Sequence, residues 1–129
     1  MRKDARDVAF KMVFEYTFSK EQKEDLINEY EIDMNLNDDD KAYIHEVYLG
    51  VVSHYDELKE LIAKNSDNFD VERIFKVDFA LLLLAIYEIK FMEQIPFKVS
   101  VNEAIELAKK YSSEKSVTFV NGVLAKFAR

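Results

Sequence analysis

The chain contains no cysteine and no tryptophan, only one proline, and only two glycines. Without cysteine it cannot form the disulfide bonds that are typical of secreted proteins, so we expect a reducing compartment. So little proline and glycine argues against an all-β protein, whose many tight turns use those residues. The composition alone therefore favours a helical protein.

Long apolar runs are also missing. The longest, FALLLLAIY at residues 79–87, is bounded by Asp78 and Glu88. It is far shorter than the roughly 20 residues that a membrane-spanning helix requires. The first residues, MRKDARD, lack the apolar segment of a secretory signal peptide. We therefore expect a cytoplasmic protein with no membrane partner and, at 129 residues, a single domain.

The net charge of −7 is unevenly distributed along the chain. Residues 21–60 hold thirteen acidic and only three basic side chains. By contrast, residues 1–20 hold five basic and three acidic side chains, and residues 96–129 hold six basic and three acidic ones. Because charges more than about 10 Å apart are largely screened, the two ends can form one basic surface if they fold side by side.

Apolar residues recur every three to four positions along most of the chain, which is the period of one helix face. The pattern continues through Asn121 and Gly122, although Asn-Gly between apolar residues is also the strongest short signal for a β-hairpin. The residues after Gly122 do not alternate as a strand would, so a helix is favoured there. The predicted helices cover residues 4–18, about 26–30, about 39–64, 71–92 with a break near Asp78, 100–111 and 117–127.

Several polar residues mark predicted helix ends. The three aspartates at residues 38–40 suit a helix amino terminus, where free N–H groups favour negative charge. They lack the alternating spacing of a calcium-binding EF-hand loop. Pro96 is expected to stop one helix, and Ser100 with Glu103 forms the S-x-x-E pattern of a capping box that opens the next.

Both glycines fall inside predicted helices, where a glycine costs about 1 kcal/mol relative to alanine. A glycine in such a place commonly reflects the close approach of another backbone. We therefore expect tight helix crossings at Gly50 and at Gly122.

The sequence offers little for catalysis. It has no thiol, and it has no glycine-rich phosphate loop. His45 and His54 do not have the spacing of metal ligands and are interpreted as ordinary helix-surface or capping residues. We therefore predict a protein that is not an enzyme and that binds no metal and no cofactor.

Three longer segments are more specific. The segment IPFKVSVNEAIELAKKYSSEKSVTFVNGVLAKF at residues 95–127 follows VDFALLLLAIYEI at residues 77–89. Together with ARDVAFKMVFEY at residues 5–16, these segments resemble the NusB family of bacterial transcription antitermination factors. The resemblance covers essentially the whole chain. It implies an all-α fold of two packed three-helix subdomains, at about residues 1–65 and 66–129.

The resemblance also implies a function. Members of the family bind the boxA segment of nascent RNA together with the small-subunit ribosomal protein NusE. They do so in complexes that help RNA polymerase to pass terminators and that support ribosomal RNA synthesis. A helical protein-interaction module or homodimer with little RNA binding is the alternative, and the RNA-binding appendage of an RNA methyltransferase is a second one. The oligomeric state and the bases that are read stay open.

The resemblance assigns RNA contacts to the amino-terminal cations and to the region around KYSSEKSVTF. Asp4 and Asp7 dilute the amino-terminal cluster, so a solvated helix start is the alternative there. Each aromatic ring could also belong to the core, Phe14 is assigned to neither core nor ligand, and Asn121 is left between capping and RNA. The implied RNA-binding residues are Arg2, Lys3, Arg6, Tyr111, Lys115 and Phe119.

The protein partner is implied to dock on the carboxyl-terminal half, at Asp78, Tyr87 and Glu88. Tyr87 and Glu88 could instead bridge helices. Where the family commonly has a basic residue, this chain has Leu83, so a contact made by that residue is not expected here.

Overall fold

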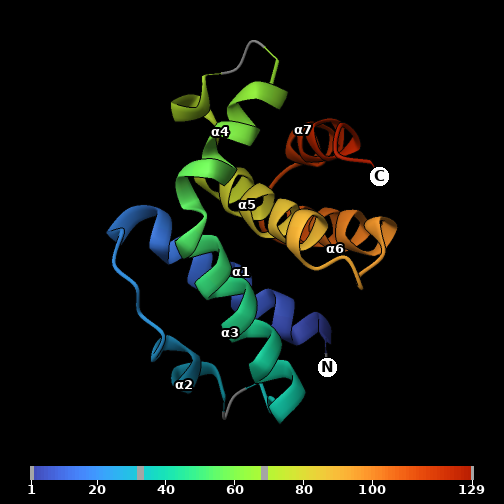
Figure 1. Cartoon of the computed structure of the whole chain (residues 1–129). Coiled ribbons are helices and arrows are strands. Elements are labelled where there is room, and N and C mark those ends of the chain that lie inside the picture. The colour runs from blue at the N-terminus through green and yellow to red at the C-terminus, as the bar shows by residue number, and fades with distance from the viewer. Residues whose placement is uncertain (1, 32–33, 68–69, 129) are drawn as a thin grey trace.

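The structure is a computed structural model that describes residues 2–31, 34–67 and 70–128. Within these ranges the chain forms helices and no strand, which confirms the predicted all-α fold (Figure 1). None of the described helices is long and apolar enough to cross a membrane. The helices are α1 (Arg2–Ser19), α2 (Leu26–Glu31), α3 (Asp38–Ser53), α4 (Tyr55–Asn65), the 3₁₀ helix η1 (Val71–Arg73), α5 (Lys76–Phe91), α6 (Phe97–Tyr111) and α7 (Glu114–Ala125).

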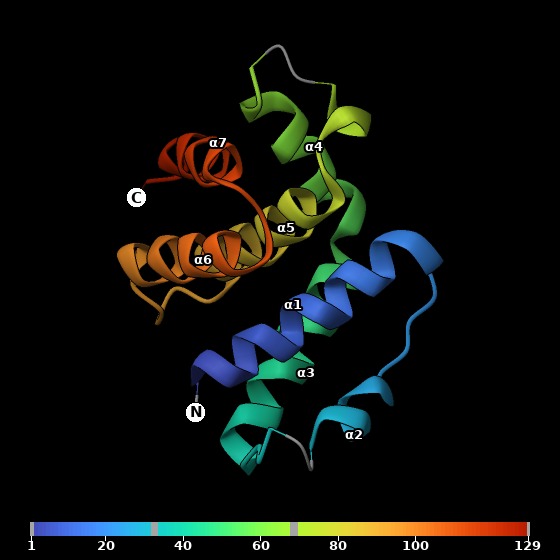
Figure 2. The same cartoon turned by 180° about the vertical axis from the view of Figure 1, so that it is seen from behind.

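Helix α5 lies at the centre of the fold. It packs against α1, α3, α4, α6 and α7, and Figures 1 and 2 show it between the two ends of the molecule. Its leucines at residues 81–84 are all buried, and most of its other residues are buried too. A helix contacted on all sides needs no polar face, which explains why this segment is the longest apolar run in the sequence.

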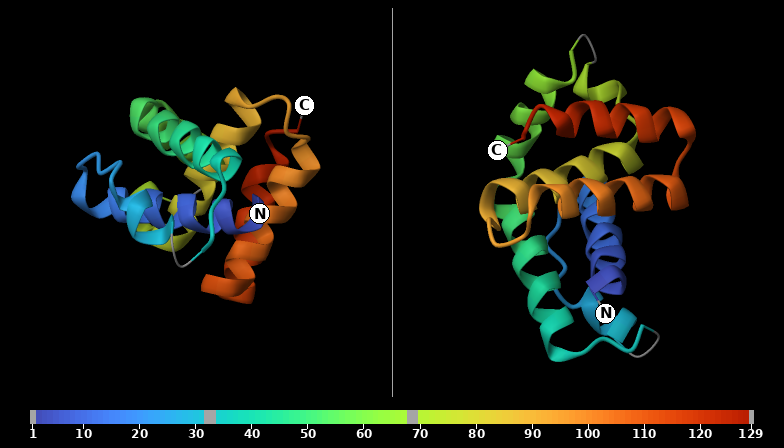
Figure 3. Two further views of the ribbon diagram at one scale, coloured as in Figure 1. Left: turned by 90° about the horizontal axis from the view of Figure 1, so that it is seen from below. Right: turned by 90° about the vertical axis from the view of Figure 1, so that its right-hand side faces the viewer.

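The remaining helices form two groups around α5. Helices α1 and α3 pack against each other, with α2 against α1, while α6 and α7 form an antiparallel pair (Figure 3). This grouping fits two three-helix subdomains, with α4 as an additional helix. One continuous cluster of buried side chains runs through both groups. The boundary near residue 65 therefore stays a prediction.

The long helix predicted over residues 39–64 is divided in two at His54, so that prediction is wrong in its length. His54 caps the end of α3, and its ring stacks on Phe91 of α5 with 4.3 Å between ring centroids. The bend lets α4 pack against α5, with Leu58 and Ile62 fully buried. Neither proline nor glycine marks the break, and the apolar period continues across it, so the chain carries no local signal for it.

The capping box predicted at Ser100 and Glu103 is also wrong, because α6 begins earlier, at Phe97. Pro96 precedes it and its carbonyl accepts a hydrogen bond from the Ser100 N–H, so Ser100 already lies inside the helix. The side chains of Ser100 and Glu103 instead contact residues of other helices. The aspartates at residues 38–40 do begin α3 as predicted, with Asn37 and Asp40 forming a reciprocal capping box.

The two glycines differ in how closely neighbouring atoms approach them. A Cβ atom on Gly50 would lie 2.0 Å from Cζ of Tyr87, so a group of α5 does approach closely there, but it is a side chain and not the backbone that was predicted. A Cβ atom on Gly122 would meet nothing within 4 Å, so the tight crossing predicted there is wrong. Helix α7 does run through Asn121 and Gly122 without a hairpin, as the apolar period predicted.

Candidate nucleic-acid interface

The two net-basic ends of the chain meet where α1 passes the end of α6. Asp7 of α1 accepts a hydrogen bond of 2.6 Å from Nζ of Lys110 and one of 2.7 Å from the hydroxyl of Tyr111. Nζ of Lys11 lies 3.3 Å from the same carboxylate. We call the side chains at positions 7, 11, 110 and 111 the Asp7 cluster. It fixes the amino-terminal helix beside the turn that leads into α7.

The Asp7 cluster keeps its carboxylate ionised. Burial of Asp7 opposes ionisation, but the hydrogen bonds from Lys110 and Tyr111 and the charge of Lys11 outweigh it, so the pKa of Asp7 is lowered below 3.8. Because Asp7 is ionised and paired with Lys11 and Lys110, it offsets part of the positive charge of this surface, as the sequence suggested.

A second cluster surrounds Glu88 of α5. Its carboxylate accepts hydrogen bonds of 3.0 and 3.1 Å from the Arg6 guanidinium, one of 2.9 Å from the Ser100 hydroxyl, and one from the Tyr43 hydroxyl. The donors come from α1, α6 and α3, so Glu88 ties three helices to the central one. We call these four residues the Glu88 network.

The charged residues of the Glu88 network are almost completely buried. Arg6 is 5% exposed and Glu88 is 1% exposed. Burial alone would lower the pKa of Arg6, but the hydrogen bonds and charge of Glu88 outweigh it and raise that pKa. Burial, reinforced by the charge of Glu88, raises the pKa of Tyr43 well above its usual value. Arg6 is therefore committed to a structural ion pair in this structure.

The other two amino-terminal cations lie at the surface above this network. The Arg2 guanidinium carbon lies 4.4 Å from the centre of the Tyr43 ring, and its Nη2 is 3.3 Å from Oδ2 of Asp39. Nζ of the exposed Lys3 lies 3.7 Å from Oε2 of Glu103. Both carboxylates are at the surface or near it, so these pairs are weak and can exchange for a phosphate.

Tyr111 is half-buried. Its ring stacks on Phe10 of α1 with 5.2 Å between centroids, while its hydroxyl is held by Asp7. Phe14, half-buried, continues this row with its centroid 5.9 Å from Phe10 and 5.0 Å from Phe18. These contacts fix the orientation of the Tyr111 ring, and only part of the ring is exposed to solvent.

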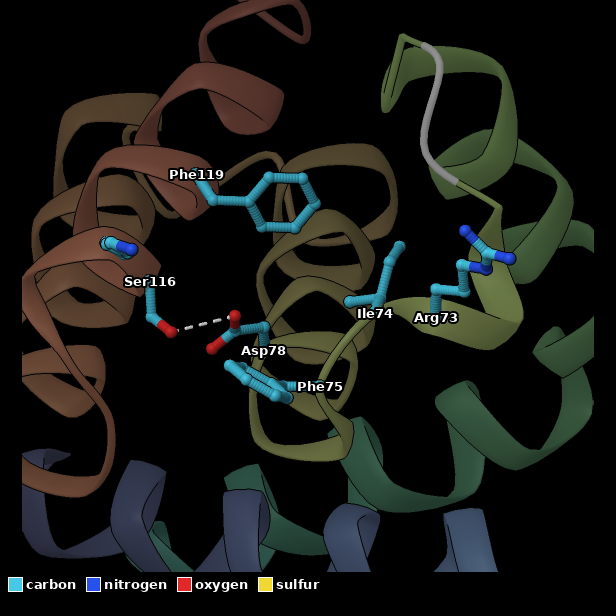
Figure 4. Close-up of a pocket in the computed structure, with 7 residues that line it drawn as sticks. Arg73, Ile74, Phe75, Asp78, Ser116 and Phe119 are labelled. Atoms are coloured by element: carbon cyan, nitrogen blue, oxygen red, sulfur yellow. Dashed lines mark hydrogen bonds between the residues drawn. The ribbon is translucent and has the colours of Figure 1, made fainter.

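The remaining two residues assigned to RNA, Lys115 and Phe119, line a hollow between α7 and the start of α5 (Figure 4). The hollow has a volume of about 260 Å³ and is mostly apolar. We call it the Phe119 hollow. Its lining residues are Arg73, Ile74, Phe75, Asp78, Lys115, Ser116 and Phe119.

Asp78 lies in the wall of the Phe119 hollow at the first turn of α5, where the sequence placed it. Its carboxylate accepts hydrogen bonds of 2.9 Å from the Ser116 hydroxyl and 3.2 Å from the Ser112 hydroxyl. Burial raises the pKa of Asp78, and the two serine hydrogen bonds only partly oppose this. Ser112 thus ties the turn after Tyr111 to α5, while Tyr111 ties it to α1.

The rim of the Phe119 hollow is positively charged. Among the residues that the structure describes, neither Arg73 nor Lys115 has an ion-pair partner, although most of the other described cations do. The ring of Phe75 is 70% exposed beside them. An exposed aromatic ring between such cations is the pattern of single-stranded nucleic-acid binding sites.

The residues assigned to the protein partner are not gathered in one exposed patch. Tyr87 is buried against Gly50 and stacks on Phe91 at 5.1 Å, and Glu88 lies inside its network. Asp78 lines the Phe119 hollow. The helix-bridging alternative for Tyr87 and Glu88 thus describes how they lie, and their part in partner binding stays a prediction.

Arg73, Phe75 and Lys110 are among the residues of these clusters that were not singled out from the sequence. Arg73 and Phe75 sit in RIFK, where basic and aromatic residues alternate between two helices, and that pattern could have identified them. Lys110 carried no such signal, because its partner Asp7 is far away in the sequence.

The sequence is similar to that of known proteins over nearly its whole length. Residues 3–129 match the sequence model of the NusB family. A transcription antitermination protein NusB from Agathobacter rectalis is 46% identical over 132 residues, covering 98% of this chain and 98% of the relative. One from Acetivibrio thermocellus is 41% identical over 128 residues, covering 99% of this chain and 88% of the relative.

Solved structures show the same fold. NusB of T. maritima superposes with a TM-score of 0.89 at 31% identity, covering 99% of this chain and 90% of the other. A crystal structure of antitermination factors NusB and NusE in complex with dsRNA gives a TM-score of 0.87 at 29% identity, covering 98% of this chain and 94% of the other. From its sequence and its fold, the chain belongs to the NusB family.

Proposed function

We propose that the chain is a transcription antitermination factor. In this role it binds boxA-type RNA together with the ribosomal protein NusE, within complexes that let RNA polymerase pass terminators and that support ribosomal RNA synthesis. Its relatives carry the name of transcription antitermination protein NusB, and a structure of the same fold contains NusB, NusE and RNA. It works in the cytoplasm as a binding adaptor rather than as an enzyme.

One observation carries this proposal most directly: hydrogen bonds hold the basic amino-terminal helix α1 beside the basic carboxyl-terminal segment that joins α6 to α7. The Asp7 cluster joins α1 to α6, and Ser112 and Ser116 join the next turn to α5. Arg2 and Lys3 lie at one end of this region, and Lys115 and Phe119 lie at the other. RNA can therefore contact cations from residues that are more than a hundred positions apart.

The structure suggests separate roles for the six residues assigned to RNA. Arg2, Lys3 and Lys115 are at the surface, where they can neutralise phosphates. Phe119 borders a hollow into which a base can stack. Arg6 is buried in the Glu88 network, so we assign it to holding α1 in place.

For the protein partner, the exposed end of α1 is a candidate contact. The ring of Phe18 is 61% exposed, packs edge-on against Phe14, and has Nζ of Lys76 6.0 Å from its centre. Aromatic side chains are enriched at protein–protein interfaces. NusE bound here would lie next to the start of α5, where Asp78 also lies.

The RNA surface is tested by replacing Arg2 and Lys3 together with alanine. Affinity should fall for all RNA sequences alike, and the log–log salt dependence should become shallower by roughly 0.7 for each phosphate that is no longer neutralised. Binding is measured by fluorescence anisotropy at several salt concentrations.

The matched control is Lys64→Ala, which removes a surface cation on α4, at the opposite end of the molecule from the amino terminus (Figure 1). It should leave the affinity and its salt dependence unchanged. An equal drop in affinity in the control and in the double variant would show that the amino terminus has no special part in binding.

A further inference from the structure

Tyr43 is the point at which the buried Glu88 network reaches the amino-terminal surface. Tyr43 is 2% exposed, and its hydroxyl donates a hydrogen bond to the Glu88 carboxylate. The guanidinium carbon of Arg2 lies over its ring, 4.4 Å from the ring centre. A surface cation of α1 therefore rests on a buried aromatic ring of α3.

The ring of Tyr43 is a fixed support. It belongs to the continuous buried core, whose close packing leaves little freedom to a large side chain. Its hydroxyl is bonded to a carboxylate that Arg6 and Ser100 also hold in place. Burial, reinforced by the charge of Glu88, raises the pKa of Tyr43 well above its usual value, so the hydroxyl keeps its proton and this hydrogen bond persists near neutral pH.

The contact of Arg2 with the ring is more durable than its contact with Asp39. Nη2 of Arg2 donates a hydrogen bond of 3.3 Å to Oδ2 of Asp39, but the Asp39 side chain is 82% exposed. An exposed ion pair of this kind is weak and is screened by salt. The attraction of a guanidinium to an aromatic ring strengthens when one side is shielded from water, as it is over a buried ring.

We propose that Tyr43 is a positioning residue of the RNA site, whose ring holds the Arg2 guanidinium at the surface while a phosphate of the bound RNA takes the place of Asp39. The inference rests on the proposed function and adds to it the residue that orients one of its cations. Tyr43 itself is too deeply buried for a base to stack on it.

A held arginine binds a phosphate more tightly than a free one, because ordering a long side chain costs conformational entropy. Contact with the ring leaves the N–H donors of the guanidinium for the phosphate, since the attraction acts on its charge. Lys3 differs, because its side chain is 71% exposed and its Nζ lies 3.7 Å from Oε2 of Glu103. Lys3 therefore serves as the matched comparison for Arg2.

The test is a double-mutant cycle on the affinity for boxA RNA, measured by fluorescence anisotropy with saturating NusE. Tyr43→Leu should weaken binding by about five-fold in a chain that keeps Arg2. It should have no effect in a chain that already carries Arg2→Ala, because the side chain that it positions is gone. In a chain that carries Lys3→Ala it should keep its full effect. A loss of the same size in the Arg2→Ala chain would overturn the proposal.

Tyr43→Phe separates positioning from stability. Phenylalanine keeps the ring but loses the hydrogen bond to Glu88, so it should restore RNA affinity to within about two-fold of the unmodified protein while lowering the urea midpoint of unfolding. Tyr48→Leu removes a buried tyrosine from the same helix and should lower the midpoint without changing RNA affinity. An affinity that follows stability across these variants would give Tyr43 a structural role only.

A measurement on the unmodified protein covers the case in which Tyr43→Leu does not fold. The hydrogen on Nε of Arg2 should have an NMR signal upfield of its random-coil position, because the guanidinium lies over the ring. The signal should stay upfield in the complex with RNA and NusE. A random-coil position in either state would overturn the proposal.

The outcomes separate this inference from the proposed function. If the unmodified protein binds boxA RNA with NusE but Arg2 and Tyr43 act independently, the positioning role is wrong and the wider function stands. If the unmodified protein binds no RNA, alone or with NusE, the proposed function fails and the role of Tyr43 fails with it.

Discussion

Glu88 receives hydrogen bonds from Arg6, Tyr43 and Ser100, which lie on three different helices. A buried ion pair of this kind contributes little compared with a well-packed apolar pair, but removing one member leaves an unpaired charge in the core. Such residue-level contacts hold the amino-terminal helix at the proposed RNA surface. Arg6 therefore matters to that surface through its position rather than through direct contact.

Replacing Glu88 with glutamine tests this role. The free energy of unfolding should fall by about 3 kcal/mol, because the buried Arg6 loses its hydrogen-bonded carboxylate and keeps only Glu103, whose Oε1 lies 3.5 Å from Nη1 of Arg6. Urea denaturation measures the change. The control is Glu60→Gln, which removes a charge from the exposed pair with Lys64 and should cost under about 0.5 kcal/mol.

A double variant, Arg6→Leu with Glu88→Leu, should be more stable than Glu88→Gln alone, because no charge is left unpaired. If Glu88→Gln costs no more than its surface control, the network does not hold the helices together.

Asp7 makes stability depend on pH in a defined direction. Its pKa in the folded protein is lowered from 3.8, so its ionised form stabilises the fold above that pH, and the gain is lost as the pH falls through the lowered pKa. The difference in unfolding free energy between the unmodified protein and Asp7→Asn should be constant near neutral pH and shrink below about pH 3.8. A difference that does not shrink at all as the pH falls below 3.8 would contradict the ion pairing of Asp7.

At the scale of helices, the regular apolar period predicted most of what forms. It placed α1, α2, the break before α5 and the continuous α7. It failed where a tertiary contact overrides a local pattern: α3 and α4 divide at His54, whose ring stacks on Phe91 of α5. The capping-box pattern failed at Ser100, whose hydroxyl donates a hydrogen bond to Glu88 and does not cap a helix end.

For the candidate site too, the sequence could not predict contacts between residues that lie far apart in the chain. The sequence and the family resemblance identified Lys115 and Phe119, which line one hollow, because they stand in a recognisable segment. They could not show that Arg6 is buried, since its partner Glu88 lies 82 positions away and nothing near Arg6 in the chain predicts it. Distance in the chain, rather than residue type, hid these contacts.

The two glycines allow a paired test of helix packing. Gly50→Ala should destabilise the protein by about 1–3 kcal/mol, because the new methyl group would overlap the Tyr87 ring and force it to move. Gly122→Ala should stabilise it by about 0.5–1 kcal/mol, because the methyl group meets open space and alanine favours the helix. Thermal unfolding of both variants provides the measurement, and shifts of the same sign would contradict this difference in packing.

At the scale of the whole molecule, the uneven distribution of charge explains how a protein with an acidic net charge can bind RNA. The acidic residues are concentrated in residues 21–60, while the two basic ends meet across α1, α6 and the start of α7. Many of the cations on this surface are paired with carboxylates of the protein, so binding by the chain alone should be weak. A second protein bound beside this surface would supply further contacts, which makes joint binding with NusE the physically favoured mode.

The most direct test of the proposed function is a titration of boxA RNA and of a scrambled RNA of the same composition, each with and without NusE. The protein should prefer boxA, and NusE should increase its affinity for boxA more than for the scrambled RNA. Equal binding of both RNAs in the presence and in the absence of NusE would contradict this function and would favour a helical module that binds proteins alone.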